Sequence, residues 1–322
     1  LTNNYPQYDD LYKNAFIHSR IVRYNKNNLE VDVFRMKKNS PLGFHEFEGQ
    51  EVVTGCKEAL EGLISRNNYR SVLVHFFDSE MWDVLSKFGN DIDIFVWVHG
   101  SEVQPWHRRL FNYNSEEEKE KAMLSSRERE DFWKTILWNQ PDNLHLIFVS
   151  EYFSEEVMED YGVSIRDGGF SVIHNPIDTE RFQYTEKNLE DRLNILSIRT
   201  FASAKYANDL TVKAIIELSK RKIFKKLSFT IIGDGPLFKE LTEPLEGLRN
   251  VSLQQRFLSN EEYEKIFEDF GVFLTPTRWD SQGVGRDEAM ACGLVPATNS
   301  ISAIPEFADS DCAILADSED YI

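Results

Sequence analysis

The chain has 322 residues, with 36 Lys and Arg against 54 Asp and Glu, so its formal net charge is −18. This length predicts two domains of ordinary size, and so acidic a surface excludes the basic footprint expected of a nucleic-acid-binding protein. Attraction to anionic lipid through overall charge is also disfavoured, although a local basic patch leaves peripheral contact with a membrane open. Three widely spaced cysteines and seven histidines without zinc-like spacing indicate a reducing compartment and no zinc site.

The first half of the chain alternates runs that favour strands with a run that favours a helix. Strands are predicted at residues 29–34, 71–77, 93–100, 144–150 and 170–178, and a helix at residues 51–67. Residues 115–141 carry dense mixed charge and gather apolar residues late, which predicts a solvated helix pair with one buried face. A mobile lid or a partner surface is the alternative. Strands separated by helices imply a parallel sheet.

The second half repeats this alternation. Strands are predicted at residues 193–199, 227–236 and 250–257, with helices at 210–221, partly at 238–247, and at 259–270. The last helix should begin with a capping box of Ser259 and Glu262. Two successive α/β units predict two Rossmann-like domains facing a cleft. They should join at the polar segment that Pro176 opens, so residues 1–182 form the N-terminal domain and residues 183–322 the C-terminal one.

Residues 271–293 predict a strand, a glycine loop and a short helix in succession. The strand should end at Pro276, and the helix should begin near Asp287 and stop at Gly293. Loop glycines let a backbone approach a ligand closely, and free N–H groups at a helix start attract anions. Carboxylates at Asp280 and Glu288 suit hydroxyl groups. Phosphate and hydroxyls together describe a nucleotide sugar, whereas the alternative is a tight turn that caps a helix.

Five segments in chain order resemble motifs of retaining GT-B glycosyltransferases, the glycosyltransferase family 4-like or glycosyl transferases group 1 proteins. That family includes bacterial mannosyl- and glucosyltransferases of cell-surface glycans. The matching segments are residues 95–103, 171–182, 195–205, 231–236 and 276–296. The chain departs from the usual pattern in three places. Asp280 replaces the usual Glu, Ile198 replaces a Gly, and one extra residue separates Arg199 from Lys205.

The resemblance assigns roles to individual residues. Arg199 and Lys205 would hold the diphosphate without a metal ion, and their position after a strand agrees with this role. Asp280 would bind a sugar hydroxyl and Glu288 the ribose hydroxyls. His99, at the end of a first-domain strand, would face the donor sugar and the acceptor. The predicted catalytic residues are therefore His99, Arg199, Lys205 and Asp280, and the predicted donor-binding residues are Arg199, Lys205, Gly283, Val284, Gly285 and Glu288.

Weaker candidates surround this set. By resemblance, Asn3 and Asn4 lie near the phosphates. Residues 106–109 follow the His-Gly loop and would shape the acceptor pocket. The backbone of residues 283–286 would bind sugar and phosphate, or Arg286 and Asp287 would instead pair on the surface. Gly233 and Gly235 lack the third glycine of a dinucleotide fingerprint, so a nicotinamide cofactor is not expected.

The resemblance implies a retaining, metal-independent glycosyltransferase without a cofactor. Its donor would be a UDP- or GDP-sugar, and its acceptor a glycan or lipid-linked molecule in bacterial surface polysaccharide synthesis. A GT-B nucleotide-sugar epimerase and a non-catalytic sugar-nucleotide-binding protein are the alternatives. We expect a cytoplasmic protein, or one located at the inner face of the membrane. We also expect the C-terminal domain to be truncated at its end. Donor base, sugar, acceptor linkage and oligomeric state are left open.

Overall fold

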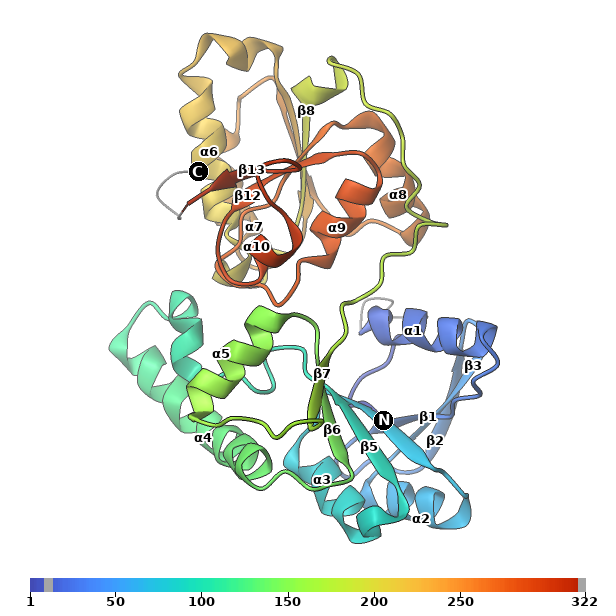
Figure 1. Ribbon diagram of the computed structural model, residues 1–322. Helices are drawn as coiled ribbons and strands as arrows, with labels where there is room; N and C mark the ends of the chain where they lie inside the picture. The colour runs from blue at the N-terminus through green and yellow to red at the C-terminus, as the bar shows by residue number, and fades with distance from the viewer. Residues whose placement is uncertain (9–13, 318–322) are drawn as a thin grey trace. The chain divides into compact units, whose positions relative to one another are not determined.

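The computed structural model describes residues 1–8 and 14–317, which form an α/β protein of two compact units (Figure 1). The first unit comprises residues 1–105, 122–149 and 154–173; the second comprises residues 106–121, 150–153 and 174–322. The predicted boundary placed residues 174–182 in the N-terminal domain. In the structure they group with the second unit, and Phe182 is buried in the core of that unit. The predicted α/β class with parallel sheets is confirmed.

The first unit contains two sheets. A four-stranded parallel sheet has the order β4 (Ser71–His75), β5 (Asp93–Trp97), β6 (Leu144–Phe148) and β7 (Phe170–Val172). A three-stranded sheet has the order β1 (Val33–Met36), β3 (Gln50–Gly55) and β2 (Gly43–Phe47), with only β2 antiparallel. Thr2 forms a parallel bridge with Arg35, and the carbonyl of Leu1 accepts from the N–H of His75. Residues 1 and 2 therefore connect β1 with β4.

The helices of the first half of the chain are short except for one. They are α1 (Ala15–Lys26), α2 (Lys57–Arg66), α3 (Ser79–Leu85), η1 (Ser86–Asp91), η2 (Trp106–Asn112), α4 (Glu116–Trp138) and α5 (Glu151–Tyr161). An apolar cluster between α1 and the three-stranded sheet includes the buried residues Tyr5, Ile17, Ile21, Val33 and Val52.

Three expectations for this half differ from the structure. The helix predicted from residue 51 begins only at Lys57, because Val52, Val53 and Thr54 are β-branched and pair with β1 and β2 in strand β3. The helix pair predicted at residues 115–141 is the single 23-residue helix α4. It contains no Gly or Pro that would interrupt it. The strand predicted at residues 29–34 is displaced, since β1 begins at Val33.

The second unit is built on one parallel sheet of six strands in the order β10-β9-β8-β11-β12-β13. The strands are β8 (Asn194–Ile198), β9 (Ser228–Gly233), β10 (Val251–Gln255), β11 (Val272–Leu274), β12 (Val295–Asn299) and β13 (Ile314–Ala316). The chain winds outward from β8 in one direction and then, from β11, in the other. The sheet therefore has a topological switch point between β8 and β11, and ligands of open α/β sheets bind outside the carboxyl ends of strands at such a point.

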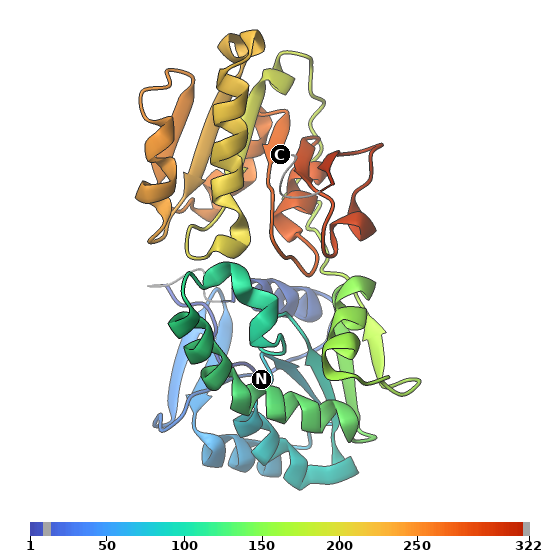
Figure 2. The same cartoon turned by 90° about the vertical axis from the view of Figure 1, so that its left-hand side faces the viewer.

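Helices cover both faces of this sheet. They are η3 (Asp191–Leu193), η4 (Ala204–Tyr206), α6 (Asn208–Ser219), η5 (Lys222–Lys226), α7 (Phe238–Thr242), η6 (Glu243–Leu245), α8 (Asn260–Lys265), η7 (Ile266–Asp269), α9 (Val284–Ala291) and α10 (Ile304–Phe307). One core cluster joins α6 and α7 to Ile195 and Phe229, and the yellow α6 lies along the sheet in Figure 2. The other joins η7 and α9 to Leu196 and Phe273 on the opposite face. The predicted capping box of Ser259 and Glu262 at the start of α8 is confirmed.

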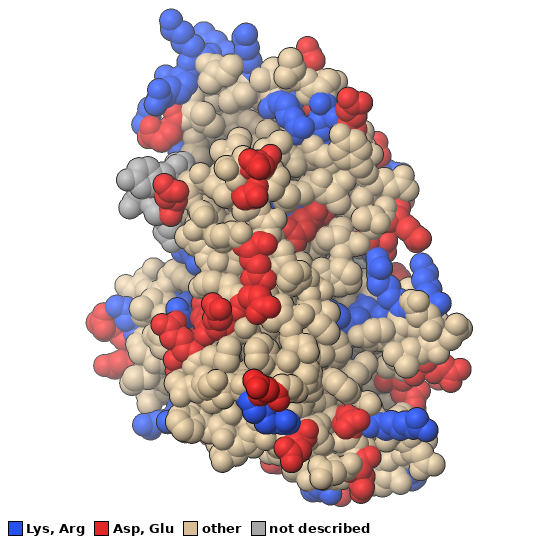
Figure 3. Space-filling model, viewed as in Figure 1, with Lys and Arg blue, Asp and Glu red and all other residues tan. Residues whose placement is uncertain are grey.

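One end of the second unit is basic although the chain as a whole is acidic. Lys220, Arg221, Lys222, Lys225 and Lys226 are exposed at the end of α6 and in η5. The side chain of Ile223 among them is 45% exposed. Figure 3 shows Lys and Arg side chains gathered at this end of the unit. Among the helices that the structure describes, none is long and apolar enough to cross a membrane.

Candidate functional site

The loop that carries Arg199 lies against the glycine turn after β9. The N–H of Arg199 donates to the carbonyl of Ile232 over 3.1 Å. A Cβ atom on Gly233 would lie 1.8 Å from the carbonyl oxygen of Arg199, and one on Gly235, at φ +143°, would lie 2.4 Å from the carbonyl carbon of Phe201. Only glycine fits at both places, so these two residues let the loop after β8 pack closely.

The guanidinium of Arg199 is largely buried and incompletely paired. Its Nη1 lies 3.8 Å from Oδ2 of Asp280, and its Nη2 donates to the carbonyl of Thr275 over 3.4 Å. Its Nε is buried without a hydrogen-bond partner among the described residues. Burial lowers the pKa of Arg199, and the Asp280 carboxylate opposes this shift. Some N–H donors of the Arg199 guanidinium are therefore unused, and an anionic ligand could accept hydrogen bonds from them.

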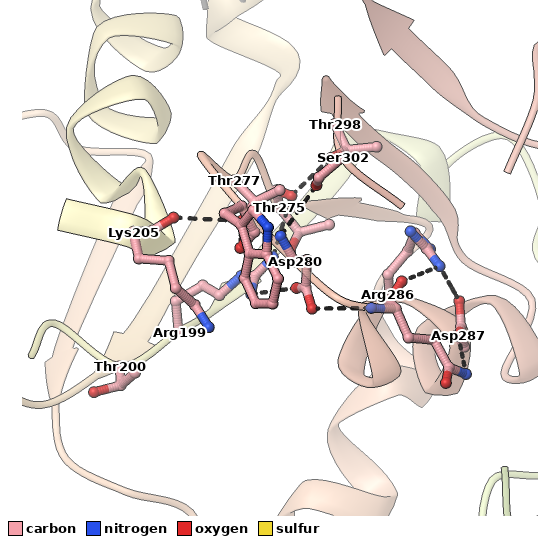
Figure 4. A network of polar contacts seen from close by, with 12 residues as sticks. Arg199, Thr200, Lys205, Thr275, Thr277, Asp280, Arg286, Asp287, Thr298 and Ser302 are labelled. Carbon is pink, nitrogen blue, oxygen red and sulfur yellow. Dashed lines mark hydrogen bonds and ion pairs between the residues drawn. The ribbon is translucent and has the colours of Figure 1, made fainter. Parts of the chain in front are cut away.

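The ammonium of Lys205 rests on two aromatic rings. Its Nζ lies 5.2 Å from the ring centre of Tyr206 and 5.1 Å from that of Trp279. The guanidinium of Arg199 lies 5.9 Å from the centre of the same Tyr206 ring, so one aromatic ring contacts both cations. Figure 4 shows the side chains of Arg199 and Lys205 next to each other. Within the described ranges, Nζ of Lys205 makes no ion pair or hydrogen bond. Cation–π contacts hold the charge in position and leave its three N–H donors available.

The loop after β11 places Asp280 beside these cations. The N–H of Asp280 donates to Oγ of Ser302 over 3.0 Å, and Oδ1 accepts from the N–H of Gln282 over 3.3 Å. The loop is anchored upstream, because Thr277 and Asn299 exchange two hydrogen bonds of 2.9 and 2.7 Å. Asp280 therefore faces Arg199 with one oxygen while its other oxygen closes the loop.

Helix α9 begins at Val284, three residues before the predicted start. Gly283 caps it in the left-handed region, at φ 95°, where other residues are strained. Glu288 consequently lies in the second turn, where the helix dipole acts weakly. Arg286 and Asp287 do pair, at 2.6 Å, but not on the surface, because Arg286 is only 2% exposed. The pair lies inside the second unit, where Arg286 also donates to the carbonyl of Gln282 in the loop before α9.

Glu288 occupies a different environment from Asp280. Its Oε2 accepts a hydrogen bond of 2.7 Å from the hydroxyl of Tyr263 on α8. Burial raises the pKa of Glu288 to about 7, although the Tyr263 hydrogen bond opposes this shift. The two carboxylates thus have separate partners, a guanidinium and a phenol. Sequence reasoning missed Tyr263, since it comes from another helix and lies 25 residues from Glu288.

His99 follows β5 and belongs to the first unit, whereas the residues above belong to the second. Its Nε2 lies 2.9 Å from Nδ1 of His75, and the two rings stack with 5.2 Å between their centres. Burial lowers the pKa of His99 to about 3, so the ring is neutral. The carboxylate of Glu102 accepts from the N–H of His99, and burial raises its pKa to about 7. Sequence reasoning missed His75 and Glu102.

The structure therefore brings together Arg199, Lys205 and Asp280, and sets Glu288 on the following helix. Gly283, Val284 and Gly285 form the start of that helix. Asn3 has a buried Oδ1 that lacks a hydrogen-bond partner in the described part of the chain, and the N–H of Asn4 donates to Thr2. Residues 106–109 form part of η2.

A cavity of about 530 Å³ lies in the first unit beside α2 and β4, and none of the predicted residues lines it. No cluster of metal-binding side chains occurs in residues 1–8 and 14–317.

Known proteins are similar to this chain in sequence and in fold. Residues 192–322 match the family model described as Glycosyl transferases group 1. This part of the chain belongs to that family. An uncharacterized 41.2 kDa protein in the cps region of Klebsiella pneumoniae is 27% identical over 195 residues, which are 58% of this chain and half the length of that relative.

Solved structures extend the similarity over nearly the whole chain. The sucrose-phosphate synthase of Thermosynechococcus elongatus superposes with a TM-score of 0.71 at 14% identity, over 96% of this chain and 81% of that one. A solved structure described as trehalose-6-phosphate from E. coli bound with UDP-2-fluoro glucose gives a TM-score of 0.56 at 12% identity, over 88% of this chain and 80% of that one. At such low identity these matches show the fold alone. The predicted GT-B fold with two Rossmann-like units is confirmed.

Proposed function

We propose that the chain is the donor- and acceptor-binding core of a retaining glycosyltransferase. It would move a sugar from a nucleotide-diphosphate sugar, with UDP or GDP as the nucleotide, to a glycan or lipid-linked acceptor. The observation that carries this proposal is the pair of incompletely satisfied cations, Arg199 and Lys205, at the switch point of the second sheet. The family match of residues 192–322 and the UDP-sugar in the E. coli relative support it.

The two cations suit a diphosphate leaving group. As the bond to the sugar breaks, negative charge grows on the departing phosphate, and preorganised cations stabilise it without rearranging. The Asp280 carboxylate, 3.8 Å from Arg199, would accept from a sugar hydroxyl and hold the ring in place. Glu288 would accept from the ribose hydroxyls. In a front-face mechanism the acceptor hydroxyl attacks the anomeric carbon from the side on which the phosphate departs, so no carboxylate has to act as a nucleophile. The departing phosphate takes the acceptor's proton, so no carboxylate has to act as a base.

His99 would act through hydrogen bonding rather than as an acid. Its lowered pKa, about 3, keeps the imidazole neutral at physiological pH. A neutral ring can exchange a hydrogen bond with a sugar hydroxyl, but it cannot act as the acid that protonates a leaving group. We therefore propose a positioning contact with the donor sugar or acceptor for His99. We predict that the reaction needs no metal ion, because Arg199 and Lys205 would neutralise the diphosphate themselves.

Two other functions remain as candidates. A GT-B nucleotide-sugar epimerase would use the same donor pocket but release free nucleotide with an isomerised sugar. A non-catalytic sugar-nucleotide-binding protein would bind without turnover, and the shorter acid at position 280 motivates this possibility. A transferred sugar on an acceptor distinguishes the first function from both. The cps-region relative favours surface polysaccharide as the setting.

The test of the proposal is donor binding followed by product analysis. A thermal-shift screen against UDP-, GDP- and ADP-sugars should identify a stabilising donor, since a ligand at about 100-fold its Kd adds about 2.7 kcal/mol. Arg199→Ala should then weaken binding about 10- to 150-fold, because it removes a charged hydrogen-bonding partner worth about 1.5–3 kcal/mol. Arg249→Ala is the control, since that exposed residue precedes the amino end of the edge strand β10, whereas Arg199 follows the carboxyl end of the central strand β8. Equal affinity of Arg199→Ala and wild type would remove the cation pair from the site.

A lipid-linked acceptor would require contact with a membrane surface. The basic residues of segment 220–226, with the exposed side chain of Ile223, are suited to an anionic lipid surface. We propose this segment as the peripheral contact of a cytoplasmic enzyme at the inner face of the membrane.

A further inference from the structure

The Tyr263 hydroxyl and the Glu288 carboxylate form a partly buried pair, in which Tyr263 lies outside the sequence motif that contains Glu288. The hydroxyl donates to Oε2 of Glu288 over 2.7 Å. The Tyr263 ring packs edge-on against Phe182 and Phe267, with ring centres 5.8 and 5.2 Å apart. Both phenylalanines belong to the core of the second unit, where each is at most 4% exposed. The phenol is therefore held in one orientation by packing, and it directs the carboxylate in turn.

This pairing uses one carboxylate oxygen and leaves the other. Oε1 of Glu288 accepts no hydrogen bond from any residue that the structure describes. A carboxylate offers about four lone-pair sites, so the remaining oxygen can accept from two neighbouring hydroxyl groups. A single fixed donor on Oε2 thus converts a flexible acid into an oriented acceptor.

We propose that Tyr263 is a positioning residue that orients Glu288 for the ribose diol of the donor nucleotide. The inference rests on the proposed function, because it assumes that the donor ribose binds at Glu288. Tyr263 itself touches neither the sugar nor the reacting atoms. Its hydroxyl fixes the orientation of the Glu288 carboxylate and favours its ionised form.

The charge of Glu288 makes this role measurable. Burial raises its pKa to about 7, and the hydrogen bond from Tyr263 opposes that shift because it favours the ionised form. The other ionisable groups that act on the pair are Arg181, Arg199, Asp287 and Cys292. Loss of one hydrogen bond to a charged group should raise the pKa of Glu288 further, by about one pH unit.

The experiment compares the affinity of wild type and Tyr263→Phe for a donor between pH 6 and pH 9. The probes are UDP-glucose and GDP-mannose, measured by calorimetry. If only the ionised acid binds the diol, a one-unit rise should weaken binding by Tyr263→Phe about ninefold at pH 6 and leave it within about 10% of wild type at pH 9. The ratio of the two proteins cancels any titration of the ligand. Tyr161→Phe is the matched control, because it removes another buried phenol hydrogen bond, of 2.7 Å to the carbonyl of Val103, in the first unit.

A purely structural role would weaken binding equally at every pH, and that result would overturn the inference. Glu288→Gln offers a second measurement should Tyr263→Phe fail to fold. Relative to that variant, wild type should lose affinity as the pH falls from 8 to 6, and a constant ratio would also overturn the inference. If Arg199→Ala and Glu288→Gln weaken binding while Tyr263→Phe follows the wild-type pH profile, the inference alone fails. If neither probe binds wild type, or if binding ignores both variants, the proposed donor site fails with it.

Discussion

Replacement of Glu288 by Gln should stabilise the folded protein above neutral pH. Burial raises the pKa of this carboxyl from its usual 4.5 to about 7. The folded state therefore binds more protons than the unfolded state between these two values, and the free energy of unfolding falls as the pH rises through them. A shift of about 2.5 pH units at 1.36 kcal/mol each corresponds to about 3 kcal/mol of lost stability above pH 7. Glutamine keeps the shape, can still accept from Tyr263, and carries no such penalty.

The assay is urea unfolding of wild type and Glu288→Gln at several pH values from 5 to 8. Between pH 5 and pH 8 the free energy of unfolding of the variant should rise relative to that of wild type by about 2.5 kcal/mol. Burial also raises the pKa of Glu102 to about 7. Glu102 is present in both proteins, so its contribution cancels when the unfolding free energies of wild type and variant are subtracted. Glu261→Gln is the control, because that exposed carboxyl pairs with Lys265, which lowers its pKa, and its difference curve should stay flat above pH 5. A flat curve for Glu288→Gln as well would refute the argument that burial makes this acid costly.

Three further predictions concern the reaction and its setting. Asp280→Asn should lower kcat more than it changes KM, because this acid would hold the ring that gains positive charge; a kcat within about twofold of wild type, ~0.4 kcal/mol, would place Asp280 away from the reacting sugar. Activity should survive EDTA, since Arg199 and Lys205 would neutralise the diphosphate, and a tenfold loss restored by Mg²⁺ or Mn²⁺ would contradict this. The triple variant K222E/K225E/K226E should lose binding to vesicles that contain anionic lipid, measured by co-sedimentation, while keeping its fold; unchanged binding would exclude this segment as the membrane contact.

The sequence was most informative where a local rule has one solution. The strand predicted at residues 227–236 ends in a glycine turn, and in the structure β9 ends at Gly233, where a Cβ on Gly233 or Gly235 would overlap the loop after β8. The capping box of Ser259 and Glu262 is equally local, and it forms as predicted. The alternation of strand and helix runs predicted parallel sheets, because side-chain period and turn residues depend on near neighbours.

Predictions failed where the local signal is ambiguous. Residues 51–55 contain apolar residues that suit a helix or a strand, and pairing with both β1 and β2 decided for the strand. The start of α9 depends on Gly283 adopting the left-handed conformation, which the loop around the buried Arg286 permits. For residues 51–55, long-range strand pairing outweighed the intrinsic preference of the segment.

The sequence by itself determined the class of fold and which charged residues follow strands β8 and β11. Only the tertiary structure decided how those residues are paired. Asp280 lies beside Arg199, Glu288 beside Tyr263, and His99 beside His75, and each pair joins different segments of the chain. The physical reason is that charge state and orientation depend on burial and on a partner's position. Both arise from packing between elements, and neither is encoded in the spacing of a motif.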